Sequence, residues 1–368
     1  MISFKKYCNL LCEGGAGGHM AHPFDLPSIN TGKQLLKLFE RVGRHLEKTP
    51  GAVKVDGVNA AVKLIETEDG GRVFAMDRGS MKQIDVDGIT IDRLAERFPP
   101  KINAETGEET AHGMINAGNT VLTILNNSIP YVEKELKKLR MWNNSNILLN
   151  LEFVEAGGTN VVTYDNNFLA FHGILKSSLK ATGKSRQQKE SAYNEEAFNS
   201  FVHKVSHVAK EHGFEVYGSI PTRITNIIDF TEALQEQVTL QLTADIAHTK
   251  SLMQWLSESR NPHNAKVRTA DGRNIQALAK EVYTYLIDEP GGPLEDYIPD
   301  KSHAKLAIGG AIFWHATRQL GNVILNNSTS PVGNVGEGIV VRGLGDIPFK
   351  ITGDFIVQGM QSKFQQVV

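Results

Sequence analysis

The spacing of hydrophobic residues predicts a helix near the start of the chain, over about 31–47. Apolar residues recur there every three or four positions, which places them on one face of a helix. Asn30 or Thr31 can cap its first turn. The residues of this apolar face are Leu35, Leu38, Phe39, Val42 and Leu46.

Strand patterns follow this helix. Residues 52–65 are rich in Val and Ala, Glu68-Asp69-Gly70-Gly71 has the composition of a turn, and residues 72–76 return as a second strand. Lys54 therefore lies at a strand end that leads into a turn, where a reactive side chain can be presented.

The next stretch is predicted as a loop, a helix and two strands. We expect a polar loop over about 98–112 and a helix over about 118–139, with a break near Pro130 because proline removes a backbone donor. Strands are predicted at about 147–155 and 168–175, and Asp165-Asn166-Asn167 is typical of a hairpin between them.

The character of the sequence changes at about residue 176. A basic polar connector comes first, over 176–189; it fits a solvated linker or a surface that follows a nucleic-acid backbone. Its basic residues are Lys176, Lys180, Lys184, Arg186 and Lys189. The pattern from about 194 to 328 is mainly helical, with helices at 229–258, 273–286 and 303–326 and an apolar stripe at Phe198, Phe201, Val202, Val205 and Val208. Strand character returns at 338–343, 347–352 and 355–357.

These elements predict an α+β protein of antiparallel sheets and helices. A glycine-rich N-terminal segment covers 1–25, and an α+β domain is split into 26–175 and 329–368. A large helical insertion covers 176–328, where it can grip RNA, bind a protein partner or brace the domain. The two parts of the α+β domain must meet in space for any chemistry shared between them.

The composition indicates a folded protein without a global charge bias. Of the 368 residues, 40% are hydrophobic, which suffices for a packed core. The 39 Lys and Arg nearly balance the 41 Asp and Glu, so any nucleic-acid surface must be a local patch. The two cysteines do not form a disulfide framework, and no apolar run reaches the roughly 18 residues of a membrane span. We therefore expect a cytoplasmic protein with no signal peptide and no membrane partner.

Two short runs, far apart in the sequence, carry the candidate chemistry. Lys54-Val55-Asp56-Gly57-Val58-Asn59 comes early, and Glu337-Gly338-Ile339-Val340-Val341-Arg342 comes late. A lysine with an ordinary pKa of about 10.4 is a poor nucleophile, and nearby cations or desolvation free its amine. Attack on an α-phosphate then needs positive charge on the phosphate oxygens and a divalent metal.

The same runs contain residues suited to those needs. Lys350 and Arg342 can supply positive charge, and the carboxylates of Glu337 and Asp56 can hold a metal or its waters. Gly57 lets the backbone turn tightly beside a nucleotide.

The early run resembles the nucleophile motif of the covalent nucleotidyltransferase superfamily, which contains DNA ligases, RNA ligases and mRNA capping enzymes. That motif is Lys-x-Asp-Gly-x-Arg, or Lys-x-x-Gly-x-Asn in RNA ligases of the phage and RNA-editing type. Asn59 stands at the last position and favours the RNA ligases. The resemblance implies an ATP-grasp-like ligase catalytic domain, and a viral source in which the host cytoplasm is the compartment.

Further segments match the superfamily in order. Asp77-Arg78-Gly79-Ser80 resembles the motif whose basic residue reaches phosphate, and Leu151-Glu152-Phe153 resembles the motif whose glutamate contacts the ribose. Phe168 to Ile174 resembles the strand whose aromatic residue stacks on the purine, here Phe171. Glu337 to Arg342 and Phe349-Lys350-Ile351-Thr352 resemble the two final motifs.

Four features depart from the pattern of the superfamily. Thr352 stands where a second lysine is usual, and His172 replaces the common acidic residue after the stacking aromatic. The gap between about 175 and 336 exceeds that of a minimal ligase. Few residues follow Lys350, so we expect no C-terminal OB domain of the kind found in DNA ligases and capping enzymes.

The resemblance implies an ATP-dependent RNA ligase with a lysyl-AMP intermediate. Lys54 attacks ATP, the adenylate passes to a 5′-phosphate end, and a 3′-hydroxyl displaces AMP. Lys350 and Arg342 offset phosphate charge, while Glu337 and Asp56 support Mg²⁺ or Mn²⁺. The implied nucleotide-binding residues are Asp56, Gly57, Asn59, Arg78, Glu152, Phe171, Glu337 and Lys350. RNA ends are preferred and DNA ends remain possible.

Other interpretations stay open at this point. The output can be DNA ligation, capping or AMP transfer, or the chain can be a binding protein with a degenerate ligase fold. Lys54, Glu152, Phe171 or Arg78 can be ordinary turn, strand-edge or core residues. Cys8, Cys12, His19 and His22 form a series whose spacing is unusual for a zinc site. The glycines at 14–18 fit a flexible entry segment or a phosphate cradle.

Overall fold

A computed structural model describes residues 20–102, 109–110, 112–156, 162, 164–243, 245–264, 275, 278–280, 282–283, 301–332, 337–345 and 347–357. The glycine-rich stretch with Cys8, Cys12 and His19 lies outside the described residues. The described chain forms two compact units. Unit 1 lies within Val55–Ile220, and unit 2 within Met20–Lys54 and Pro221–Val368.

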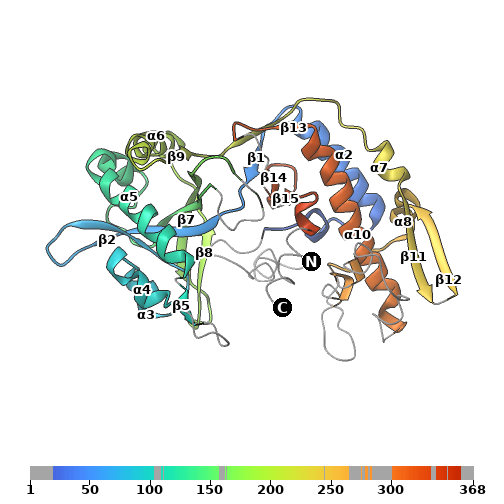
Figure 1. Ribbon diagram of the computed structural model, residues 1–368, viewed down its shortest axis with the longest axis horizontal. Coiled ribbons are helices and arrows are strands. Elements are labelled where there is room, and N and C mark those ends of the chain that lie inside the picture. The colour runs from blue at the N-terminus through green and yellow to red at the C-terminus, as the bar shows by residue number, and fades with distance from the viewer. Residues whose placement is uncertain are drawn as a thin grey trace. The chain divides into compact units, whose positions relative to one another are not determined.

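Unit 1 is built on a six-stranded sheet (Figure 1). The strands follow the order β3-β2-β6-β7-β8, and β9 lies beside β7 as the one parallel neighbour among these pairs. Their bounds are β2 (Val58–Glu66), β3 (Arg72–Met76), β6 (Ile147–Val154), β7 (Phe168–Leu179), β8 (Arg186–Glu190) and β9 (Glu215–Tyr217).

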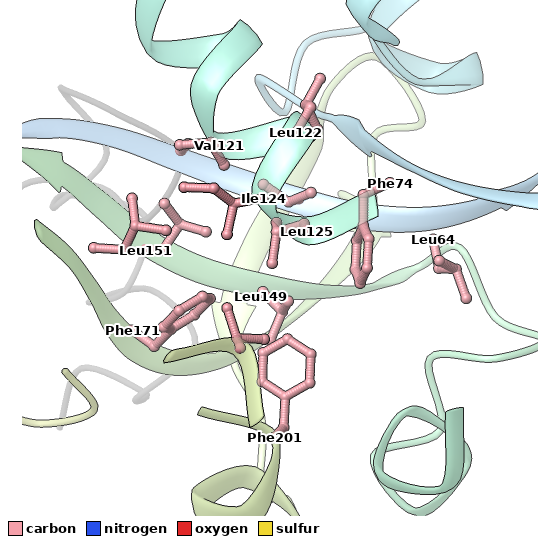
Figure 2. Close-up of a cluster of buried hydrophobic side chains, with 14 of the residues drawn as sticks. Leu64, Phe74, Val121, Leu122, Ile124, Leu125, Leu149, Leu151, Phe171 and Phe201 are labelled. Carbon is pink, nitrogen blue, oxygen red and sulfur yellow. The ribbon is translucent and has the colours of Figure 1, made fainter. Parts of the chain in front are cut away.

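Helices α5 (Gly113–Lys138) and α6 (Glu195–Glu211) pack together over one face of this sheet. Side chains of alternate strand positions, such as Leu149 and Leu151, point to these helices and build the core of unit 1 (Figure 2). The opposite face of the same strands carries polar residues. The remaining elements of unit 1 are α3 (Gln83–Asp87), η3 (Ile91–Arg93), α4 (Leu94–Arg97), β4 (Lys101–Ile102) and β5 (Glu109–Thr110).

Unit 2 contains a five-stranded sheet in the order β13-β10-β1-β14-β15. All of its neighbouring strands are antiparallel. Their bounds are β1 (Gly51–Lys54), β10 (Pro221–Ile224), β13 (Ser328–Thr329), β14 (Gly338–Val341) and β15 (Phe349–Ile351).

Helices and one hairpin complete unit 2. Helix α2 (Gly32–Leu46) is capped by Thr31, whose side chain accepts a hydrogen bond from the Gln34 amide. It packs with α8 (Leu252–Glu258) and α10 (Lys301–Asn326). The other elements are η2 (Pro23–Asp25), α7 (Thr231–Gln235) and the hairpin of β11 (Gln237–Thr243) and β12 (Ile246–Ser251).

The predicted α+β class with antiparallel sheets is confirmed, as are the helix capped by Thr31 and the pairing of β6 with β7. Among the described residues, no helix is long and apolar enough to cross a membrane. The predicted helical range 176–328 is divided between the two units at Ile220.

Several predicted elements were wrong in detail. Residues 52–65 form two strands of different sheets, because the chain turns at Gly57, where a Cβ would lie 2.7 Å from the Phe153 carbonyl oxygen. Helix α5 runs through Pro130 without a break in its assignment, since burial against the sheet outweighs the lost backbone donor. Residues 229–258 contain the β11–β12 hairpin, and residues 355–357 are helical.

Candidate functional site

The sheet of unit 2 places Lys54 beside Glu337. Strand β1 pairs with β14, so that Lys54 lies opposite Gly338 and its carbonyl accepts a 2.8 Å hydrogen bond from the Glu337 amide. The Lys54 Nζ and Glu337 Oε2 atoms are 2.6 Å apart, and the two side chains are 22% and 15% exposed. The structure thus joins the two motifs in one ion pair that is only partly shielded from water.

Strand register places Lys350 on the same face of this sheet as Lys54. Ala52 pairs with Val340, and Val340 pairs with Lys350. Side chains alternate between faces along a strand, so positions 52, 54, 340 and 350 share one face. Lys350 lies two strands and two positions away from Lys54, which is roughly 12 Å between Cα atoms. Two lysine side chains can span that separation to reach one phosphate group.

Gly338 places no side chain at the position opposite Lys54. Its φ angle is 150°, and a Cβ at this position would lie 2.0 Å from the Ile351 carbonyl oxygen. Thr352 lies on the other side of Gly338, and its side chain is fully buried. Thr352 therefore brings no charge to the position where a second lysine is usual in the superfamily that the sequence resembles.

Arg342 lies at the other end of β14. It follows the last residue of the strand and is exposed. Four positions separate it from Gly338, a distance of roughly 13 Å along the strand. The charge-offsetting role of Arg342 therefore stays a prediction.

Asp25 is a candidate site residue that sequence reasoning missed. The Lys350 amide donates to the Ala21 carbonyl at 2.9 Å, so the chain just before η2 lies against β15. The Asp25 carboxylate accepts a 2.8 Å hydrogen bond from the His22 amide. Burial raises the pKa of Asp25 to about 6, while that hydrogen bond and the charge of Lys350 act to lower it. No motif spacing could have paired Asp25 with Lys350.

In unit 1, Asp56 and Gly57 shape the backbone. The Asp56 amide donates to the Tyr164 hydroxyl at 3.0 Å, and the Asp56 carboxylate accepts from the Val162 amide at 2.9 Å. Gly57 packs directly on β6, where no Cβ fits. Both residues hold the loop around Tyr164, a role that the sequence did not indicate.

The polar face of the unit 1 sheet carries Asn59, Glu152 and His172. Asn59 pairs directly with Glu152 across β2 and β6, and its Nδ2 donates to the Asn150 Oδ1 at 3.1 Å. Glu152 is 5% exposed, and its Oε2 lies 2.7 Å from the His172 Nε2. A register shift of β7 opposite Asn150 and Leu151 accompanies this pair. His172 thus takes up the place of the usual acidic residue by binding the neighbouring glutamate.

A buried charge network ties the same face together. The Asp77 carboxylate is fully buried and binds Lys63 at 3.0 Å and Arg186 at 2.5 Å. Lys63 also donates to the carbonyls of Asp85 and Val86, at 2.9 and 2.7 Å. Burial lowers the pKa of Lys63, against the effect of Asp77. A lysine inside the apolar run Val62-Lys63-Leu64 was the sequence signal for this network, because buried lysines need partners.

Arg78 follows Asp77 and borders this network. Its Nη1 donates to the Asn59 carbonyl at 3.0 Å. Burial, and then repulsion from Arg97, lower the pKa of Arg78. The Asp85 carboxylate lies between the two guanidinium groups: it is ion-paired with Arg97 at 3.2 Å and acts to raise the pKa of Arg78.

Phe171 lies in the hydrophobic core and not on the polar face. It is fully buried and meets Phe201 of α6 edge-on, with ring centroids 5.6 Å apart (Figure 2). The expectation that Phe171 stacks on a base is therefore corrected: its ring faces the helices. Phe168 is also buried, between Tyr164 and Tyr217.

No preformed metal cage lies in the part of the chain that the structure describes, where no group of three or more His, Cys, Asp or Glu could hold an ion. Glu337 and Asp56 are therefore single carboxylates.

The chain was compared with known proteins. No protein-family model, no curated protein and no solved structure matches it. Its function is therefore inferred from the residues and contacts described above.

Proposed function

We propose that the protein is a nucleotidyltransferase that uses Lys54 to form a lysyl-AMP intermediate, and that it acts as an ATP-dependent polynucleotide ligase on RNA ends. The observation that carries this proposal is the ion pair of Lys54 with Glu337 at 2.6 Å, with Lys350 on the same sheet face. An isolated lysine in a surface turn would have neither neighbour.

The chemistry assigns a step to each of these groups. The deprotonated Lys54 amine attacks the α-phosphorus of ATP, an N–P bond forms, and the P–O bond to pyrophosphate breaks. Glu337 holds the Lys54 ammonium before the reaction, so loss of this contact must precede attack. Lys350 offsets charge on the phosphate oxygens. A 5′-phosphate end then displaces Lys54 to take the adenylate, and a 3′-hydroxyl finally displaces AMP.

Glu337 and Asp56 fit a divalent ion only as single ligands, since the described residues offer no cluster of three. Mg²⁺ or Mn²⁺ held by Glu337 and the nucleotide phosphates would neutralise phosphate charge.

The polar face of unit 1 supplies the groups proposed for nucleotide recognition. Glu152, fixed by His172, can accept hydrogen bonds from ribose hydroxyls, and Arg78 can bind phosphate.

Covalent labelling tests this function. Purified protein is incubated with α-³²P-labelled ATP and Mg²⁺, beside the variants Lys54→Ala and Lys33→Ala, and is then separated on a denaturing gel. We expect label on the wild type and on Lys33→Ala, an exposed lysine of α2, and none on Lys54→Ala.

Label on Lys54→Ala contradicts the assignment of the nucleophile. A wild type that takes no label, and that mass spectrometry shows to carry no AMP beforehand, contradicts catalysis and favours a degenerate site. Chase of the labelled enzyme with RNA ends, DNA ends, diphosphate ends or protein distinguishes RNA ligation from DNA ligation, capping and AMP transfer.

A further inference from the structure

The basic connector 176–189 is a β-hairpin and not a linker. Residues of β7 and β8 pair from Leu175 with Glu190 to Leu179 with Arg186, and the intervening turn closes with a hydrogen bond from the Lys180 amide to the Ser185 carbonyl at 2.8 Å. Both strands belong to the main sheet of unit 1 (Figure 1). The positions of its basic side chains are therefore held by the sheet.

The hairpin concentrates positive charge. Residues 176–189 contain four lysines, one arginine and no acidic residue, in a chain whose net charge is −2. Lys176 and Lys189 are directly opposite each other, and both are exposed. Like charges in this arrangement destabilise a sheet. Folding alone therefore gives no reason to place them there.

The lysines differ from the arginine of the same hairpin. Arg186 is turned to the polar face and is bound to Asp77 and Ser177. Within the residues that the structure describes, no side-chain hydrogen bond or ion pair is found for Lys176, Lys180, Lys184 or Lys189. Their charges remain available to an anion from outside the protein.

We propose that this lysine hairpin binds the phosphodiester backbone of a nucleic-acid strand. Four cations spread over a rigid hairpin match a linear array of phosphates, and they lie outside the Lys54–Glu337 pair proposed to carry the chemistry. An anionic membrane fits less well, because Leu179 is the one large apolar side chain exposed on this hairpin. The choice of RNA as the strand rests on the proposed function; the binding surface does not.

The salt dependence of binding gives the decisive measurement. If four lysines neutralise four phosphates of a single strand, the slope of log affinity against log salt is about −2.8, which is roughly a 50-fold loss between 50 and 200 mM salt. Lys176→Gln with Lys189→Gln halves the slope to about −1.4, a loss of roughly 7-fold over the same range.

The experiment measures fluorescence anisotropy of a labelled single-stranded RNA of 20 nucleotides, and of the DNA of the same sequence, with the full chain. The matched control is Lys134→Gln with Lys138→Gln, which removes two exposed lysines from α5 of the same unit. A second variant, Lys180→Gln with Lys184→Gln, changes only the turn end of the hairpin and guards against a folding defect in the first. We expect both hairpin variants, and not the control, to lower the slope.

Equal slopes for wild type and hairpin variants overturn the proposal, as does binding of the wild type to phosphatidylserine vesicles without binding to either strand. Labelling with ATP in the absence of a strand separates the two proposals. If the wild type takes no label but the hairpin variants still lose RNA affinity, the nucleotidyltransferase assignment fails and the binding surface stands.

Discussion

The two sheets of this protein differ in how completely their charged side chains are buried. On the polar face of unit 1, Asp77 is fully buried and bound by Lys63, Arg186 and Gln188 at once. On the sheet of unit 2, Lys54 and Glu337 form a pair that water still reaches. The first arrangement fixes side chains through several simultaneous bonds, and the second can open without leaving a fully buried charge.

This difference indicates where reaction is possible. A fully buried ion that loses a partner is costly, so the Asp77 network suits a rigid support. The Lys54–Glu337 pair keeps contact with water, with side chains 22% and 15% exposed, so its partners separate at a lower cost than those of a fully buried pair. The contrast supports the proposal, in which Lys54 and Glu337 react and the pair of Lys63 with Asp77 supports the proposed nucleotide contacts of unit 1.

The variant Asp77→Asn tests most directly whether the Asp77 network is a rigid support. It leaves Lys63 and Arg186 buried without their carboxylate, and we expect a loss of about 3–5 kcal/mol in the free energy of unfolding. Urea denaturation, with hydrogen exchange of peptides from β2 and β7 as the local readout, measures it. A loss below about 1 kcal/mol would show that the network is not a support. Asp69→Asn, in an exposed turn, is the control.

His263 tests whether fully buried ionisable groups also occur in unit 2, outside its sheet. This residue of unit 2 is buried against Phe24, and burial lowers the pKa of His263 to about 4 although the Gly310 carbonyl acts to raise it. The unfolded chain gains this proton near pH 6.5 and the folded chain does not. Stability is therefore full above pH 6.5 and falls toward pH 4 by about 3 kcal/mol.

His263→Gln removes this titration, so its stability should change less over the same pH range than that of the wild type. Thermal unfolding between pH 4 and 8 measures the difference. Parallel curves for the two proteins contradict the buried neutral imidazole.

Asp25→Asn tests a carboxylate of unit 2 that is raised in pKa by burial and acted on by the charge of Lys350. Because burial raises the pKa of Asp25 to about 6, its ionised form is disfavoured in the folded state. The protonated carboxyl contributes its full stabilisation below the unfolded-state pKa of about 3.8. This contribution is lost as the pH rises through the folded-state pKa of about 6. Asparagine keeps an acceptor for the His22 amide without this loss, so the variant should exceed wild-type stability at pH 8 by up to about 3 kcal/mol.

The measurement for Asp25→Asn is urea denaturation at pH 8 and pH 4. The difference between the two proteins should vanish at the lower pH. A variant less stable than the wild type at pH 8 would show that the electrostatic attraction of Lys350 outweighs the cost of burial.

Among these variants, we expect Glu337→Gln to change the free energy of unfolding least. Removing a partly exposed ion pair costs under about 1 kcal/mol. Lysyl-AMP labelling should nevertheless fall about 100-fold or more, because the carboxylate proposed to hold the divalent ion at the phosphates is lost. Thermal unfolding and the gel assay are read on the same preparation. An intact labelling rate would remove Glu337 from the proposed site.

Local patterns predicted the elements whose periodicity is undisturbed. Helix α2, with its cap at Thr31 and its buried Leu35 and Phe39, follows directly from 3.6-residue spacing. The β11 strand shows an equally clear period of two in Val238, Leu240 and Leu242, although it lies within a range predicted as helix. Trp255 of α8 donates to the Val238 carbonyl, a long-range contact that no local pattern contains.

For the candidate site, the sequence predicted the motif residues but not all of the residues that lie around them. Lys54, Glu337 and Lys350 were predicted together, and strand register explains their proximity. The direction of Phe171 could not be predicted, because the shift of register in β7 decides which residues face the helices. Asp25 depends on a pairing between Ala21 and Phe349, at opposite ends of the chain.

The pairing of β1 with β14 has a consequence during protein synthesis. Glu337 is synthesised about 280 residues after Lys54, which takes roughly 15–60 s at usual translation rates. Until then β1 lacks the strand that carries its ionic partner. The proposed reactive pair is thus assembled only after β14 has been made, so a product truncated before Glu337 lacks the Lys54–Glu337 contact.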